Sequence, residues 1–110
     1  MKTVRVEGQN YSIVVYPVRR VLRAVGNGQG EEVDQTMVSI YRDGMEHSGT
    51  GVAFCSPKDV FDGVTGINLA LQRALKLVLV PRAPGTFALR SLTSAEKAKF
   101  YQHVLGVSRS

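Results

Sequence analysis

The chain has 110 residues, of which 44% are hydrophobic and 21% charged, and a formal net charge of +5. This length and composition predict one globular domain and exclude a wholly disordered chain. Its single cysteine, Cys55, excludes an internal disulfide, and its longest apolar run is far too short to cross a bilayer. Because no secretory leader pattern is present, we expect a soluble intracellular protein whose positive charge favours anionic partners.

The first half of the chain has the alternating, β-branched pattern typical of strands. We expect strands over residues 3–7, 11–16, 18–25 and 36–42, with a helical turn as the alternative for residues 18–25. Between the last two, residues 26–32 contain three glycines and two acids without an apolar anchor, which predicts an exposed loop.

Asp43-Gly44 predicts a tight hairpin turn, because glycine tolerates the positive φ that such turns require. The returning strand is expected over residues 45–55. Within it, Ser48-Gly49-Thr50-Gly51 predicts a bulge or a close approach of the backbone to another element.

In the second half, apolar residues recur at helical spacing. Six positions form one face: Ile67, Ala70, Leu71, Ala74, Leu75 and Val78. The break at Gly63 predicts that this main helix starts near Thr65, and Pro81 lies beyond its end. A short strand is expected over residues 86–89.

Thr93 and Glu96 have the spacing of a capping box, which predicts a last helix that ends before Gly106. Its inward residues are expected to be Ala98, Tyr101 and Leu105. Residues 1–110 are therefore predicted to form a single α+β domain. An N-terminal antiparallel sheet is followed by a main amphipathic helix and a short C-terminal helix.

No arrangement of residues typical of catalysis is evident. Cys55 lies in an apolar strand context, which favours a buried structural cysteine over a nucleophile, and neither His47 nor His103 has a sequence-evident link to it. Asp59 and Asp62 are best explained as caps on successive helical turns. Metal-ligand spacings and glycine-rich phosphate loops are absent. We expect a binding protein rather than an enzyme, without a catalytic residue, metal or cofactor.

Two consecutive patterns carry a resemblance. Residues 49–62 read G-T-G-V-A-F-C-S-P-K-D-V-F-D, and residues 66–75 read G-I-N-L-A-L-Q-R-A-L. Together they cover about a quarter of the chain and resemble the Thoeris anti-defence family of phage proteins. That resemblance implies a non-enzymatic sponge that sequesters a cyclic ADP-ribose-type signal or a cyclic oligonucleotide. It also implies a location in the cytoplasm of the infected bacterial host.

The resemblance places Phe61 and Asp62 in the nucleotide pocket, with Phe61 stacking on a base and Asp62 accepting from ribose or adenine. It offers Arg42, Asn68 and Arg90 as contacts for phosphate or ribose. A pocket between copies in a homo-oligomer would suit so short a chain. The residues alone leave a second reading open, in which Phe61 is a hydrophobic staple that covers the core.

Two other functions remain open from the sequence. The strand–helix order also resembles double-stranded-RNA-binding-like domains, and a nucleic-acid-binding module would use Arg19, Arg20 and Arg23 on the backbone. However, Lys58 is the only basic residue in the approach to the main helix, where that family carries several lysines. The third candidate is a protein-binding inhibitor of a host factor, which would use an exposed sheet edge or the acidic loop at Glu31-Glu32.

Overall fold

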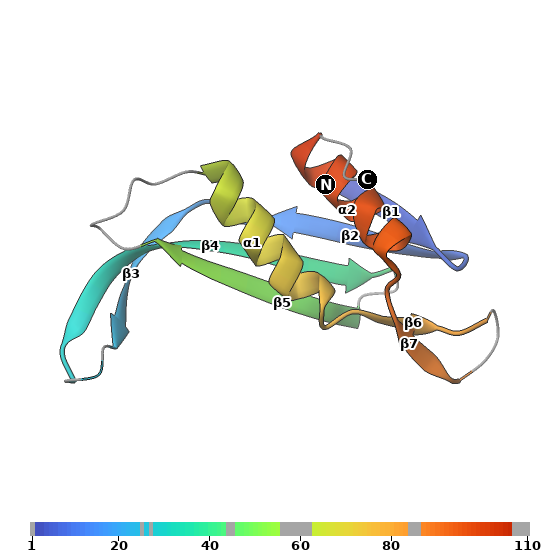
Figure 1. Ribbon diagram of the computed structural model, residues 1–110, viewed down its shortest axis with the longest axis horizontal. Helices are drawn as coiled ribbons and strands as arrows, with labels where there is room; N and C mark the ends of the chain where they lie inside the picture. Colours follow the sequence, from blue (N-terminus) through green and yellow to red (C-terminus); the bar gives the residue numbers. More distant parts are fainter. Residues whose placement is uncertain are drawn as a thin grey trace.

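The computed structural model describes residues 2–24, 26, 28–43, 46–55, 63–83 and 87–106. Within these residues the chain forms seven strands and two helices (Figure 1): β1 (Lys2–Val6), β2 (Gln9–Val15), β3 (Arg19–Ala24), β4 (Gly30–Arg42), β5 (Glu46–Cys55), α1 (Gly63–Leu75), β6 (Leu79–Pro81), β7 (Leu89–Ser91) and α2 (Ser94–Leu105).

The sheet is built around β4, a strand of thirteen residues. β2 pairs with its residues 38–42 and β3 with its residues 30–35, so these two strands follow one another along the same edge. β5 pairs with the other edge, and β1 extends the sheet beyond β2. All pairings in this five-stranded sheet are antiparallel, while β6 and β7 form a separate pair.

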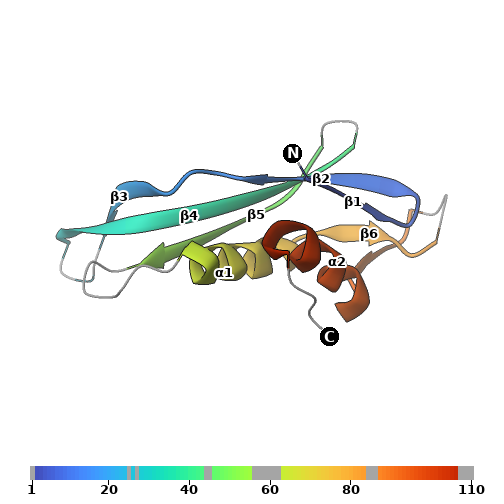
Figure 2. The ribbon, with the colours of Figure 1, turned by 90° about the horizontal axis from the view of Figure 1, so that it is seen from above.

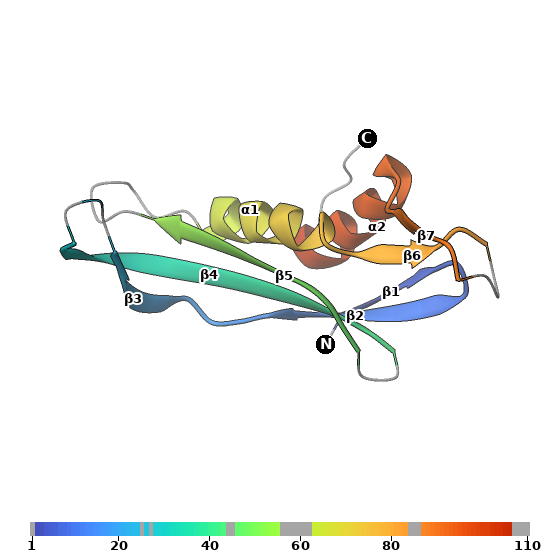
Figure 3. The same cartoon turned by 90° about the horizontal axis from the view of Figure 1, so that it is seen from below.

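Both helices lie on the same side of the sheet (Figures 2 and 3). Because side chains alternate between the two faces of a strand, the even-numbered residues of β4, such as Val38 and Ile40, face the helices. The odd-numbered residues 31–41 and the residues opposite them form the face away from the helices, called here the open face. The predicted α+β fold, with an antiparallel sheet followed by two helices, is confirmed.

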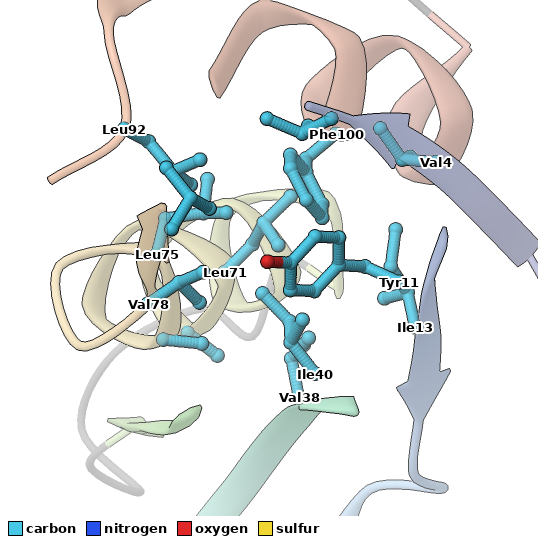
Figure 4. Packing of buried hydrophobic residues seen from close by; sticks show 14 of the residues in the cluster. Val4, Tyr11, Ile13, Val38, Ile40, Leu71, Leu75, Val78, Leu92 and Phe100 are labelled. Carbon is cyan, nitrogen blue, oxygen red and sulfur yellow. The ribbon is translucent and has the colours of Figure 1, made fainter. Parts of the chain in front are cut away.

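The hydrophobic core fills the space between the helices and the sheet (Figure 4). The rings of Tyr11 from β2 and Phe100 from α2 meet edge to face, with their centroids 6.2 Å apart. Leu71 and Leu75 of α1 pack into the same cluster, and all four side chains are at most 1% exposed. The apolar face predicted for the main helix is therefore the face that is buried.

Two glycines allow α1 to pack directly on β5. A Cβ atom added to Gly51 would overlap the backbone carbonyl oxygen of Ala70, and one added to Gly49 would lie 2.6 Å from the carbonyl oxygen of Ala74. The ladder between β4 and β5 also shifts register next to Ile40, which places a bulge at this point. Both features predicted for the glycine-rich segment, the close backbone approach and the bulge, are confirmed.

Several predicted boundaries were wrong. β4 begins at Gly30, six residues before the predicted start, so Glu31 and Glu32 belong to a strand rather than a loop. The ladder with β3 extends this strand where the apolar alternation gives no signal. α1 spans Gly63–Leu75, two residues earlier at its start and three shorter at its end than the pattern predicted, and β7 begins only at Leu89. The hairpin joining β4 and β5 is present, but Gly44 lies outside the described residues.

The capping box of α2 is confirmed. Thr93 accepts from the backbone N–H of Glu96, the Glu96 side chain accepts from the backbone N–H of Thr93, and Gly106 ends the helix in a left-handed conformation. The residue that α2 buries fully is Phe100, which the sequence did not single out. The three residues predicted to point inward, Ala98, Tyr101 and Leu105, are only partly buried.

The molecule is elongated, because β3 and residues 30–35 of β4 project beyond the start of α1 (Figure 1). This projection is called here the arm, and the helix-covered remainder is called the body. The extents are 49 × 29 × 22 Å and the radius of gyration is 15.6 Å. A compact domain of this length would have a radius of gyration of about 13 Å.

Candidate functional site

The nucleotide site implied by the sequence resemblance centres on the start of α1. Phe61 and Asp62 immediately precede this helix in the sequence, and both lie outside the described residues. The first turn of α1 contains no acidic residue, and its Val64 and Thr65 are exposed. The helix dipole places a partial positive charge at this start, directly after Asp62 in the sequence.

Asn68, in the second turn of α1, has an unusual environment. Its side chain is partly buried, and its Oδ1 atom is inaccessible and has no hydrogen-bond partner among the described residues. A buried carbonyl oxygen without a donor costs free energy, typically about 1–3 kcal/mol. A ligand donor could satisfy this oxygen once a local rearrangement exposes it.

The position of α1 on the sheet fixes where this site lies. A Cβ atom added to Gly66 would lie 2.8 Å from the hydroxyl of Thr36, so the first turns of the helix sit over the middle of β4. Further along the helix, Arg73 donates to the backbone carbonyl of Val52 in β5 at 2.6 Å. This bond secures the side of α1 that faces the free edge of β5.

Arg42 is the last residue of β4 and lies opposite Tyr11 of β2, on the helix side of the sheet. The Tyr11 hydroxyl is buried without a hydrogen-bond partner among the described residues. Burial raises the pKa of Tyr11, while the charges of Arg42 and Arg90 lower it. The structure therefore brings Arg42 and Arg90 to the same end of the body, around this tyrosine.

Arg90 is engaged by other parts of the chain. Its two terminal nitrogens donate to the two carboxylate oxygens of Glu96 at 2.6 and 2.8 Å, and it also lies 3.3 Å from Glu7. The bidentate bond with Arg90 is the main reason that the pKa of Glu96 falls to about 2. Arg90 thereby joins β7, α2 and the turn after β1, and this structural role uses the donors that a phosphate would need.

Among the described residues, the predicted contacts Asn68 and Arg42 do not lie together. Thr36, which lies under the start of α1, is six residues from Arg42 along β4. That separation corresponds to about 20 Å at the usual strand rise of about 3.3 Å per residue. Asn68 and the start of α1 are therefore far from Arg42, and a small ligand cannot contact both within one chain.

The arginines of β3 divide between the two faces of the arm. Arg20 lies on the helix side, 3.4 Å from Asp34, whereas Arg23 lies on the open face, 3.7 Å from Glu31. Arg19 shares the open face with Arg23. The three arginines proposed to grip a duplex backbone do not form one continuous basic surface.

The open face carries a tyrosine pair and an arginine–phenylalanine stack that sequence analysis missed. The hydroxyls of Tyr16 and Tyr41 lie 3.1 Å apart, and hydrogen bonds with Tyr41 and then Ser39 lower the pKa of Tyr16. In the arm, the guanidinium of Arg23 lies 5.3 Å from the centre of the Phe54 ring. The period-two alternation of the strands signalled the existence of such a face, but the register that brings these residues together is not visible in the sequence.

The described residues do not meet the requirements of a metal site, a buried cysteine or a membrane-spanning helix. Among them, no three His, Cys, Asp or Glu side chains are placed to hold a metal ion. Cys55, expected to be buried, is partly exposed because it ends β5 opposite Asp34 of the arm. Neither helix in the described part of the chain has the length and apolar character needed to span a membrane.

Comparison with known proteins gives no relative for this chain: no family model, curated protein or solved structure matches it.

Proposed function

We propose that this chain is a phage anti-defence protein that binds and sequesters a small cyclic nucleotide signal without cleaving it. The signal would be of the cyclic ADP-ribose type or a cyclic oligonucleotide, encountered in the cytoplasm of the infected bacterium. The observation that carries the proposal is the unpartnered Asn68 Oδ1 in the second turn of α1. This helix directly follows the Phe61-Asp62 pair on which the resemblance rests.

The chemistry of this region suits a nucleotide. A phosphate at the start of α1 would be attracted by the helix dipole. The Phe61 ring would stack on a base, and Asp62 would accept a hydrogen bond from ribose or adenine. An amino or hydroxyl group of the ligand would give Asn68 the donor that it lacks.

The proposal includes a second copy of the chain. Arg42 lies about 20 Å from the start of α1 along β4, by the usual strand rise. If Arg42 contributes to phosphate binding, it reaches the ligand from a neighbouring copy, which fits the homo-oligomer expected from the size of the chain. The engagement of Arg90 with Glu96 and Glu7 favours a supporting role for that residue instead.

Thermal melting with a panel of cyclic ADP-ribose isomers and cyclic di- and trinucleotides tests this function. A ligand that binds only the folded protein raises its melting temperature in proportion to the logarithm of its concentration. We expect a rise of several degrees with one cyclic nucleotide, absent in Phe61→Ala. The recovered ligand should be chemically unchanged when the protein is denatured, as chromatography would show.

Asn68→Leu is the decisive variant, with Gln72→Ala on the exposed side of the same helix as its control. Leucine removes the unpartnered oxygen, so the unliganded Asn68→Leu protein should melt at or above the wild-type temperature while losing the ligand-induced rise. Gln72→Ala should keep that rise. An Asn68→Leu protein that binds like wild type, or a panel that produces no shift, would overturn the proposal.

A further inference from the structure

The arm separates charge between its two faces. On the open face, Arg19 and Arg23 of β3 accompany one acid, Glu31, whereas the helix side carries Arg20 with Glu32 and Asp34. The open face also holds Arg5 of β1, which bonds to Asn10 beside it. Among the described side chains that share these strands, the open face is therefore basic and the helix side of the arm is acidic.

The Arg23–Phe54 contact is a preformed stack on the open face. Arg23 pairs with Glu31 and Phe54 with Gln35, so the arginine reaches diagonally across β4 to place its guanidinium over the ring. Val33 lies between them on the same face and is only 1% exposed. The Phe54 side of the stack remains accessible, since that residue is 39% exposed.

The tyrosine pair continues this surface along the sheet. The Tyr16 and Tyr41 side chains meet over Ser39, which is 3% exposed and bonds to Thr50 at 2.9 Å. Met37 of β4 lies between the tyrosine pair and the arm. The open face thus presents aromatic rings along the strands with arginines beside them, and neither helix covers it (Figure 3).

We propose that the open face binds single-stranded nucleic acid. Unpaired bases stack on accessible aromatic rings. Phe54 offers an exposed ring and Tyr16 a partly buried one, while Arg19 and Arg23 lie on the same face to meet the phosphates of the strand. A duplex keeps its bases stacked inside and could not use these rings. A second copy that docked through its own open face would bring the same excess of arginine, so charge favours a polyanion over that form of self-association.

This site is separate from the one in the proposed function. It lies on the side of the sheet opposite α1, and it uses none of Phe61, Asp62 or Asn68. Either site can therefore be present without the other, and each experiment reports on its own site.

The test is fluorescence anisotropy with labelled oligothymidine and oligouridine of about 15 nucleotides, close to the upper site size of a single-strand-binding module. Titrations are repeated between about 50 and 200 mM salt, where phosphate contacts show as a linear fall of log affinity against log salt concentration. Wild-type protein should bind both strands, and an equivalent duplex should bind more weakly.

Matched arginine variants separate the two faces of β3. The double variant Arg19→Gln/Arg23→Gln should weaken binding and make the salt slope shallower by about 1.4, the value for two lost phosphate contacts on a single strand. Arg20→Gln removes the same charge from the same strand on the opposite face, and it should leave the slope near the wild-type value. Phe54→Leu keeps an apolar side chain but loses the ring, and it should weaken binding by about fivefold or more.

Three outcomes would overturn the proposal. The first is the absence of single-strand binding at the lowest salt concentration. The second is an Arg20→Gln variant as impaired as the double variant, because net charge rather than the open face would then explain binding. The third is concentration-dependent self-association by light scattering that Phe54→Leu abolishes, which would assign this face to a second copy. Circular dichroism of each variant confirms that the fold is intact before binding is compared.

Discussion

The body and the arm share the same strand, β4, but they are stabilised differently. In the body, Tyr11, Ile40 and Phe100 are completely buried between the sheet and the helices. In the arm, five of the six residues of β3 are exposed, and Leu22 retains 73% of its accessible surface. The body is held by the hydrophobic effect, whereas the arm depends on backbone pairing and on ion pairs that water screens.

This difference shows where the chain can accommodate function. Side chains in a close-packed core are constrained by their neighbours, and even small changes of volume there are costly. Side chains of the arm meet few such constraints, so its composition can serve binding. The arginines of β3 are therefore available for the single-strand binding proposed above without a cost to the core.

The sharpest way to break the comparison is to place the same substitution in both regions. Gly51→Ala would drive a methyl group into the backbone of α1 and should destabilise the fold by at least about 3 kcal/mol, the upper end of overpacking effects. Gly30→Ala in the arm meets only the Leu22 side chain, at 3.4 Å, and should be nearly neutral. Chemical denaturation of both variants measures the difference. Equal losses would show that the arm is packed as tightly as the body.

Removing a large side chain from each region should give the next largest contrast. Phe100→Ala leaves a cavity beside Tyr11 and should cost about 3–5 kcal/mol of unfolding free energy. Leu22→Ala removes an exposed side chain, and it should change stability by no more than about 0.5 kcal/mol. Urea unfolding curves measure both losses. Equal losses for Leu22→Ala and Phe100→Ala would show that side chains of the arm contribute as much to the free energy of unfolding as those of the core.

The Arg90–Glu96 pair gives the body a dependence on pH. The pKa of the Glu96 carboxyl in the folded protein is about 2, below its ordinary value of 4.5, so the ionised carboxylate stabilises the folded state. This contribution is fully present above about pH 5, and it is lost progressively as the pH falls towards 2. The melting temperature of wild type should therefore fall more steeply over this range than that of Glu96→Gln. Parallel curves for the two proteins would contradict the prediction.

The smallest effect is expected from the ion pairs of the arm. Arg20 and Asp34 are 3.4 Å apart, but the Arg20 side chain is 61% exposed. Asp34→Asn should therefore reduce stability by no more than about 0.5 kcal/mol, in the range of exposed pairs. A differential scanning measurement beside Glu96→Gln at neutral pH provides the comparison. A larger loss for Asp34→Asn would show that charge pairing holds the arm more firmly than its exposure suggests.

Sequence reasoning succeeded where the cause was local. The helical spacing of apolar residues identified the buried face of α1, Thr93 and Glu96 identified the start of α2, and the glycines before Cys55 identified a close backbone contact. These features follow from the conformations of a few adjacent residues, which the order of the side chains specifies directly.

It failed where the cause was a pairing between distant segments. The start of β4 at Gly30 depends on its ladder with β3, which the weak apolar signal of the arm does not reveal. The burial of Phe100 depends on Tyr11 in another element, and the stack of Arg23 on Phe54 depends on two registers at once. For the candidate nucleotide site, the sequence named Asn68, but only the fold revealed that its oxygen lacks a partner and that Arg42 lies far away.

The glycines of β5 have one more consequence. A strand shifted by a single residue turns every side chain to the opposite face. Under α1, a shift of β5 would bring Thr50 or Val52 to positions where only a hydrogen atom fits, so Gly49 and Gly51 act as pins that fix its alignment with β4. Because β4 and β5 continue into the arm, the same two glycines fix the register that places Phe54 on the open face beside Arg23 rather than towards the helices. Two glycines buried in the body thereby determine which side chains of the arm lie next to each other on the open face.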